Sequence, residues 1–286
     1  MISAAVRDAL ARELGAEPTD ATPLSGGSIN DAYAVSLDDG RRVFVKENAG
    51  ADSTMFPTEA RGLEWLRAAG AIRVPEVLAV AGDPGFIALE LIESSRRAGD
   101  FCERLGRQLA ALHRAEPDGF GLDHDNFIGR LPQSNRPAES WAEFYARERI
   151  GPQMDMACDA GLLSGSDRQE LEALMAKLPE LVGDPEPAAR LHGDLWGGNL
   201  HVGESGEPCL IDPAVFGGHR EMDLAMMQLF GGFDRRVFAA YDEAYPLQPE
   251  WRDRISLYQL YYLLVHVNLF GSGYLGQTRS AMRRYL

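Results

Sequence analysis

Apolar and polar positions in the first third of the chain alternate between helical and strand-like spacing. Val6, Leu10 and Leu14 form one helical stripe before Gly15, and Gly40 closes a tight turn between two apolar runs. The pattern predicts a helix, two strands, a second helix and two further strands over residues 3–14, 32–37, 41–47, 58–69, 77–80 and 86–92. This region is therefore expected to hold two β-hairpins, each preceded by a helix.

From residue 100 onward the spacing becomes mainly helical. Phe101, Leu105, Leu109 and Leu112 lie on one helical face. The same spacing predicts further helices over residues 140–153, 167–178, 222–230 and 251–270. We therefore expect an α+β protein of two lobes, a small β-rich N-terminal lobe (residues 1–94) and a large, mainly helical C-terminal lobe (residues 95–286). The junction of two such lobes is a common place for a ligand cleft.

Composition narrows the class of protein. The chain has 286 residues, 45% of them hydrophobic, which is enough to build sizeable cores. Its formal charge of −15 argues against nucleic acid as a partner, and it favours a cationic substrate only weakly, since solubility also explains an acidic surface. No segment approaches the roughly 20 apolar residues of a membrane span, and no targeting segment is visible, so we expect a cytoplasmic protein with no membrane partner. The oligomeric state stays open, with a monomer favoured.

One short segment carries the most chemical information. His192-Gly193-Asp194 is followed by Asn199, five residues after the Asp, as in the catalytic loop of kinases. In that loop the Asp accepts or orients the proton of the acceptor hydroxyl, and the Asn binds a Mg²⁺ on the ATP phosphates. Asp212 ends a short apolar strand further on, where its carboxylate is a suitable second Mg²⁺ ligand. An ordinary turn would explain His192-Gly193-Asp194 alone, but not the ordered set.

Three earlier features fit the binding of ATP. Lys46 ends a predicted strand, from which it could reach the α- and β-phosphates, and Glu59 in the next helix could pair with it. Each has a plainer alternative, a solvated lysine and an exposed carboxylate at a helix start. Backbone N–H groups of Gly26, Gly27 and Ser28 could cover phosphates, although this turn lacks the full spacing of a glycine-rich loop. No P-loop sequence is present.

Several segments of the chain together resemble the fructosamine kinase (ketoamine kinase) family, a branch of the protein-kinase-like fold. Residues 191–199 resemble its His-Gly-Asp-Leu-Trp-x-Gly-Asn signature, and Ile211-Asp212-Pro213-Ala214 with Gly218-His219 resembles its Asp-Pro-Ala…Gly-His block. Residues 44–46, 56–59, 231–233, 266–271 and 282–284 are similar too, so the resemblance spans nearly the whole chain.

The resemblance implies a function. A kinase of this family would phosphorylate the sugar 3-hydroxyl of a fructosamine or ribulosamine, and the product would fall apart and release the amine, which amounts to deglycation repair. Asp194 would be the base, Asn199 and Asp212 the Mg²⁺ ligands, and Lys46 the phosphate contact. Glu90, Leu91 and Ile92 would form the adenine-binding hinge. Ser28 stands where many relatives carry a Cys, so redox control through that loop is not expected.

The acceptor side of the site is less well defined by the sequence. The resemblance implies that Trp196 lines the acceptor pocket, and His266 and Asn268 are further candidates, although all three also suit packing roles. Two alternatives remain open at this point. One is an aminoglycoside, choline or homoserine kinase of the same fold, and the other is a catalytically silent nucleotide-binding protein.

Overall fold

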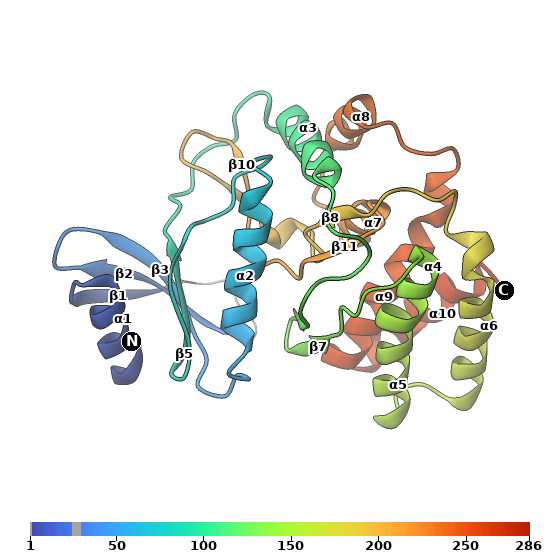
Figure 1. Ribbon diagram of the computed structural model, residues 1–286, viewed down its shortest axis with the longest axis horizontal. Coiled ribbons are helices and arrows are strands. Elements are labelled where there is room, and N and C mark those ends of the chain that lie inside the picture. Colours follow the sequence, from blue (N-terminus) through green and yellow to red (C-terminus); the bar gives the residue numbers. More distant parts are fainter. Residues whose placement is uncertain (1, 25–29) are drawn as a thin grey trace.

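The computed structural model describes residues 2–24 and 30–286, which form two lobes joined by one extended segment (Figure 1). The N-terminal lobe contains a five-stranded antiparallel sheet of order β1-β2-β3-β5-β4 and two helices. Its elements are α1 (Ala4–Leu14), β1 (Pro18–Leu24), β2 (Asp31–Leu37), β3 (Arg42–Glu47), α2 (Met55–Ala68), β4 (Val77–Gly82) and β5 (Gly85–Glu90).

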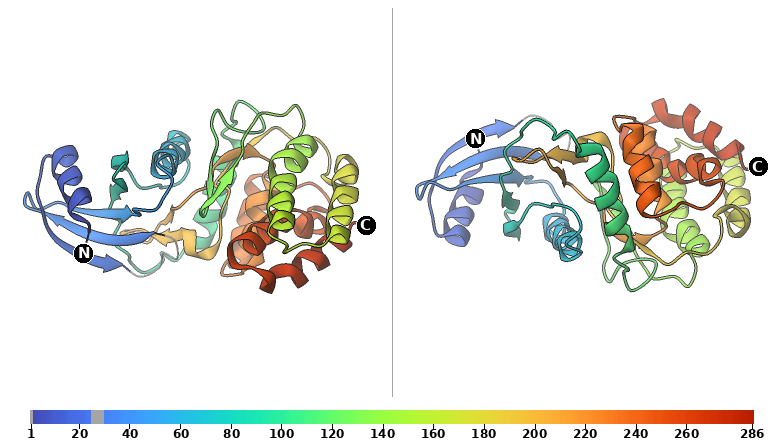
Figure 2. Two further views of the ribbon diagram at one scale, coloured as in Figure 1. Left: turned by 90° about the horizontal axis from the view of Figure 1, so that it is seen from below. Right: turned by 90° about the horizontal axis from the view of Figure 1, so that it is seen from above.

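The central strands of this sheet are apolar on both faces because a helix covers each face. Along β5, Phe86 and Ala88 pack in one core with α1, whereas Ile87 and Leu89 pack in another with α2. The second core continues into the C-terminal lobe, where it includes Leu105 of the first helix there. The side of the sheet that carries α2 therefore faces the junction between the lobes, as both views of Figure 2 show.

The predicted elements of this lobe are confirmed, with three differences. Strand β1 was not predicted, because Pro18 and Pro23 interrupt its pattern and its side chains are largely exposed at the sheet edge. Helix α2 begins at Met55, three residues before the predicted start. Strand β5 ends at Glu90, so that Leu91 and Ile92 lie in the segment that links the lobes.

The C-terminal lobe is mainly helical and is built around one buried helix, α9. From Leu257 to Val267 this helix is mainly apolar and buried, and it packs against α5, α7 and α10, as expected of a helix in the interior of a domain. Helices α3 and α8 pack side by side near the lobe junction (Figure 1). The helices are α3 (Phe101–Arg114), α4 (Trp141–Phe144), a π-helical turn (Tyr145–Ile150), α5 (Gly151–Asp159), α6 (Gly165–Leu181), α7 (Glu221–Leu229), α8 (Arg235–Ala244), α9 (Trp251–Phe270) and α10 (Leu275–Arg283).

Short strands of this lobe form the ends of several loops. Three two-stranded antiparallel ladders are present in the described part of the chain. The segment 91–98 contacts the hairpin formed by β9 and β10, since the Ser95 hydroxyl donates to the carbonyl of Gly203 and the Ala98 N–H donates to that of Gly206. They pair β6 (Asn126–Ile128) with β7 (Leu131–Gln133), β8 (Ala189–Leu191) with β11 (Phe216–Gly218), and β9 (Leu200–Val202) with β10 (Pro208–Leu210). Short 3₁₀ turns span Gly197–Asn199 and Ser272–Tyr274. The predicted helices are confirmed, whereas α8 and α10 were not predicted.

Candidate active site

The loop between β8 and β9 is held in place by a buried carboxylate from α7. Asp223 accepts hydrogen bonds from the backbone N–H groups of His192 (2.8 Å) and Gly193 (2.9 Å). Gly193 has φ +82°, and a Cβ there would lie 2.0 Å from the carbonyl oxygen of Ala214, so only glycine fits. The hydrogen bonds of Asp223 and the close packing at Gly193 therefore fix the conformation of this loop before any ligand binds.

Two further buried side chains extend this support. Nε2 of His113, on α3, lies 3.1 Å from Asp223 Oδ2, and its Nδ1 lies 2.8 Å from the Tyr241 hydroxyl on α8. Burial alone would raise the pKa of Asp223, but its hydrogen bonds and the nearby histidines outweigh burial and lower that pKa. Asp223 is therefore ionised, and three helices meet at it.

His192 braces the loop through both nitrogens of its ring. Its Nδ1 accepts from the N–H of Asp194 (3.2 Å), which leaves the proton on Nε2, and Nε2 donates to the carbonyl of Ile211 (2.9 Å). Burial lowers its pKa, so the ring stays neutral. This contact ties Asp194 to the strand end that carries Asp212.

Asp194 and Asp212 are joined by the side chain of Asn199. The Asn199 Nδ2 donates to the carbonyl of Asp194 (2.8 Å), to its Oδ2 (3.2 Å) and to the carbonyl of Asp212 (3.2 Å). Burial, with the negative charge of Asp212, raises the pKa of Asp194 to about 7. A carboxyl group with a pKa near neutrality is well suited to accept a proton from a hydroxyl.

Lys46 lies between two carboxylates at the lobe junction. Its Nζ is 2.8 Å from Glu59 Oε1 on α2 and also contacts Oδ1 of Asp212. Burial alone would lower the pKa of Lys46, but the charges of Asp212 and Glu59 outweigh it and raise that pKa. The Lys46–Glu59 pair expected from the sequence is thus present, and the side chain of Lys46 is buried rather than solvated.

The residues predicted to hold Mg²⁺ fit that ion. The hydrogen bonds of the Asn199 amide use Nδ2, so its Oδ1 is available, and the Asp212 side chain is 42% exposed at the junction. Within residues 2–24 and 30–286 no group of three or more His, Cys, Asp or Glu side chains could hold a metal. Two hard oxygen ligands suit Mg²⁺ that arrives with ATP, because Mg²⁺ takes its remaining ligands from phosphates and water.

The three acceptor candidates differ in their surroundings, and of these Trp196 lies on the catalytic loop itself. The Trp196 side chain is 41% exposed and lies over Gly198, where a Cβ would be 2.2 Å from the indole. His266 is partly buried, and its Nδ1 donates to the carbonyl of Tyr262 (2.7 Å). Asn268 is turned elsewhere, since its Nδ2 donates to the backbone (2.9 Å) and side-chain (2.8 Å) oxygens of Gln153 on α5. The structure therefore does not bring Asn268 together with His266.

Comparison with known proteins identifies the family. The family model for fructosamine kinase matches residues 2–286. This chain belongs to the fructosamine kinase family. Mouse ketosamine-3-kinase is 39% identical over 307 residues, which cover 96% of this chain and 97% of the mouse protein. A solved structure from Thermobifida fusca, provisionally named as a fructosamine-3-kinase, is 40% identical, with a TM-score of 0.90 over 98% of both chains.

Membership of the fructosamine kinase family confirms the expected enzyme class, a phosphotransferase with an alcohol group as acceptor. The bilobal protein-kinase-like fold is confirmed as well. A choline kinase from Streptococcus pneumoniae has the same fold, with a TM-score of 0.67 over 98% of this chain and 97% of that chain at 15% identity. Such a low identity shows the fold alone.

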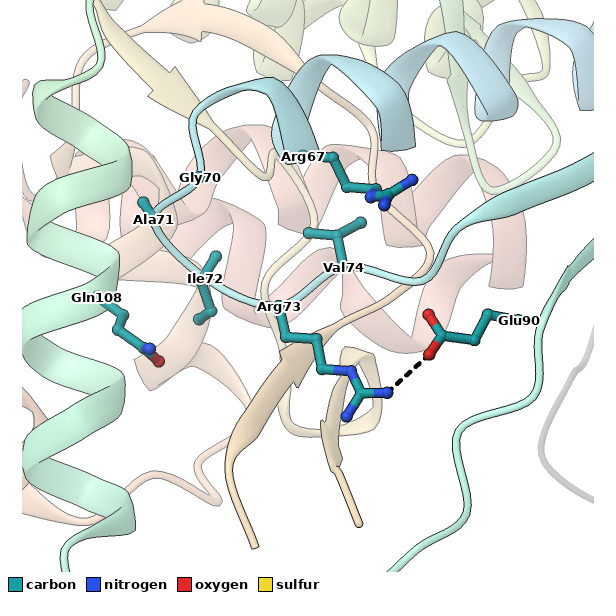
Figure 3. A pocket seen from close by; sticks show the side chains of 8 residues that line it. All are labelled: Arg67, Gly70, Ala71, Ile72, Arg73, Val74, Glu90 and Gln108. Atoms are coloured by element: carbon teal, nitrogen blue, oxygen red, sulfur yellow. Dashed lines mark hydrogen bonds and ion pairs between the residues drawn. The ribbon is translucent and has the colours of Figure 1, made fainter. Parts of the chain in front are cut away.

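The predicted hinge of this fructosamine kinase family member holds its carboxylate away from the site. Glu90 Oε1 is 2.7 Å from Arg73 (Figure 3), and the Glu90 N–H donates to the carbonyl of Glu76 (2.9 Å). Arg73 also contacts Glu207, and its carbonyl accepts from the N–H of Leu210 (2.9 Å). It borders a shallow pocket of about 370 Å³.

Some parts of the site could not be found by sequence reasoning. Asp223, His113 and Arg73 each act across elements distant in the chain, and the signal available was only a polar residue within an apolar stretch. Gly26, Gly27 and Ser28, which are predicted to cover phosphates, lie outside the described residues.

Among the helices of the described residues, none combines the length and the apolar composition that a membrane span requires.

Proposed function

We propose that this protein transfers the γ-phosphoryl group of ATP to the sugar 3-hydroxyl of a ketoamine, a fructosamine or ribulosamine adduct. The observation that carries the proposal is the side-chain arrangement at the junction, in which Asn199 holds the carboxylate of Asp194 beside Asp212, and Lys46 reaches Asp212. Family membership and the name of the mouse relative support the choice of acceptor.

The protein's part in this reaction is positioning and charge. The ionised Asp194 accepts the proton of the acceptor hydroxyl and aligns its oxygen with the γ-phosphorus, so that the bond to the ADP oxygen breaks as the new P–O bond forms. Lys46, aimed by Glu59, offsets the negative charge of the phosphates. Asn199 and Asp212 would hold a Mg²⁺, which would supply positive charge against the phosphates of ATP. Leu91 and Ile92 would supply backbone contacts to adenine, and Trp196 would line the acceptor pocket.

The proposed biological role is deglycation. A 3-phosphorylated ketoamine would fall apart and return the free amine, so the enzyme would reverse early sugar damage to amines. A cytoplasmic location and a monomeric state remain predictions.

The test is Mg²⁺-dependent consumption of ATP by the purified protein across several acceptors. The panel holds ribulosyl-lysine, fructosyl-lysine, choline, homoserine and an aminoglycoside, with mass spectrometry of each product. We expect turnover confined to the two ketoamines, with the added phosphate on the sugar. Turnover only on choline, homoserine or the aminoglycoside would keep the kinase chemistry and overturn the acceptor. No ATP consumption with any of them would contradict the proposal as a whole.

A further inference from the structure

Four aromatic side chains gather beside the catalytic loop without a function assigned to them as a group. Phe230 follows α7, His266 and Phe270 lie on α9, and Tyr274 follows in the short turn after α9. The ring of His266 is the centre, 4.8 Å from the ring of Phe230, 5.4 Å from that of Phe270 and 4.9 Å from that of Tyr274. These four residues are called the aromatic cluster below.

The aromatic cluster is unusual because two of its four rings are exposed. Phe270 is 56% exposed and Phe230 43%, and with Trp196 they make up half of the six large apolar side chains that the described residues expose. Scattered apolar side chains on a surface need no explanation, but a contiguous exposed aromatic patch marks a binding surface.

The aromatic cluster borders the site of phosphoryl transfer. Gly231, next to Phe230, has its carbonyl oxygen 3.8 Å from where a Cβ of Gly197 would lie, so this segment touches the catalytic loop. On α9, Tyr262, His266 and Phe270 are spaced by four residues and form one stripe. The stripe therefore runs from the buried Tyr262 to the exposed Phe270 at the surface.

The chemistry of the aromatic cluster suits a protonated amine with a hydrocarbon substituent. Because Nδ1 of His266 donates to the Tyr262 carbonyl, its Nε2 is a hydrogen-bond acceptor in the neutral ring, and burial keeps the ring neutral by lowering its pKa. Aromatic faces attract cations within about 6 Å of the ring centre. The C-terminal end of α9 at Phe270 adds partial negative charge.

We propose that the aromatic cluster binds the amine-bearing end of the acceptor while the sugar hydroxyl lies at Asp194. This inference rests on the proposed function and deepens it. The occupant is the protonated secondary amine of the ketoamine together with the alkyl chain that it carries, and the open outer edge at Phe270 lets that chain continue into solvent. The enzyme then selects ketoamines by the amine, favouring adducts of alkyl amines such as a lysine side chain over adducts of amino acids whose carboxylate lies next to the amine.

The experiment compares acceptors that share one sugar and differ in the amine. Ribulosyl-butylamine, ribulosyl-Nα-acetyl-lysine and ribulosyl-glycine are assayed with the wild-type protein and with Phe270→Ala, Phe230→Ala, Phe270→Trp and Leu78→Ala. Leu78 is the matched control because it is an exposed apolar residue on β4 of the other lobe. Thermal unfolding of each variant checks that it folds.

We expect the wild-type protein to have the lowest KM for the two alkyl adducts. Loss of one aromatic face in Phe270→Ala should raise those two KM values about fivefold, with kcat and the KM for ATP within a factor of about two. The KM for ribulosyl-glycine should change little, Phe270→Trp should restore the preference, and Leu78→Ala should match the wild type. Equal KM values for all three adducts, or a preference that survives both alanine variants, would overturn this inference while leaving the proposed function intact. Absence of turnover on every ketoamine would overturn both.

Discussion

The two sides of the candidate active site are built from different kinds of side chain. On the nucleotide side, Lys46, Glu59 and Asp212 are charged, close together and already paired with one another. On the acceptor side, the aromatic cluster and Trp196 are rings, several of them exposed and with few polar partners. The ion pairs pre-organise the proposed nucleotide side for a ligand that is the same in every turnover. The proposed acceptor side offers shape and ring faces, which on our proposal would select the acceptor.

The largest effect should come from the residue between the two sides. Asp194→Asn keeps the shape and the size of the side chain but removes the proton acceptor, so kcat should fall about 10³-fold. Binding of ATP, followed as a thermal shift with Mg²⁺, should be nearly unchanged because Asp194 acts on the acceptor. The control is Asp253→Asn, since Asp253 is an exposed carboxylate paired with Arg284 on the surface. Turnover close to that of the wild type would show that Asp194 is not the base.

A smaller effect, confined to the nucleotide side, is expected from the Lys46 ion pair. Lys46→Met removes the charge opposite the phosphates and should lower kcat/KM for ATP about 10²-fold. Glu59→Gln keeps Lys46 but removes the carboxylate that orients it, so kcat/KM for ATP should fall less than in Lys46→Met. Glu64→Gln, an exposed position on the same helix, should behave like the wild type. If these variants instead changed the preference among acceptors, the separation of the two sides would be wrong.

The same contrast explains which parts of the site could be predicted from sequence. Asp194 and Asn199 are five residues apart on one loop, and Asp212 follows on the next strand end, so their proximity is largely a local property of the chain. Predicting the ion pair of Lys46 and Glu59 required one further assumption, that a helix follows the strand. These five residues could therefore be named before the structure was known.

The supporting residues, and the rings that gather around His266, could not be predicted because tertiary packing alone brings them together, whereas Trp196 and His266 themselves were candidates from the sequence. Phe230 and His266 come from two helices, and His113 reaches Asp223 across 110 positions of sequence. Asn268 shows that closeness in sequence does not ensure closeness in space. The resemblance implies a role for Asn268 beside His266, but two residues along a helix turn a side chain through about 200°. Asn268 therefore packs on Gln153 instead. The main elements of the fold followed from spacing, apart from β1, α8, α10 and the short strands β6, β7, β8 and β11.

A third prediction concerns pH and tests the electrostatics of Asp194. Its pKa is raised to about 7, and the reaction needs the ionised form, so kcat/KM for the acceptor should fall about tenfold per pH unit below that value and level off above it. Because the charge of Asp212 contributes to the shift, a cation bound at Asp212 should lower the pKa that governs kcat at saturating Mg²⁺ and ATP. A pH-independent kcat/KM between pH 5 and 8 would contradict this assignment.

The same shift predicts how stability depends on pH. Between the ordinary pKa of an Asp near 4 and the value near 7, the folded state holds a proton on Asp194 that the unfolded chain has lost. Raising the pH through this window therefore favours unfolding, and the stabilisation is full only below it. Asp194→Asn cannot titrate, so its free energy of unfolding should decline less over the same range. An identical decline in both proteins would place the titrating group elsewhere.

The smallest effect on activity should come from replacing Arg73, which contacts the nucleotide side only through Glu90 and Glu207. Arg73 joins Glu90 at the end of β5 to Glu207 at the start of β10, the strand that leads to Asp212. Arg73→Ala leaves two carboxylates facing each other without their cation, and we expect the KM for ATP to rise about threefold, since partly exposed ion pairs contribute roughly 0.2–1 kcal/mol each. The effect should weaken in high salt because exposed charges are screened.

Arg67→Ala is the matched control for Arg73→Ala. Arg67 lines the same shallow pocket, but its side chain is 45% exposed, and its Nη1 lies 4.0 Å from Glu76 Oε1 within the same lobe. If Arg67→Ala and Arg73→Ala raise the KM for ATP equally, the shallow pocket is responsible rather than the bridge that Arg73 forms between Glu90 and Glu207. If only Arg73 matters, and the double variant Arg73→Ala with Glu90→Gln is no worse than Arg73→Ala alone, the two side chains act as one unit. The KM for the acceptor should stay constant throughout, because this bridge contacts the strand that leads to Asp212 and not the rings around His266.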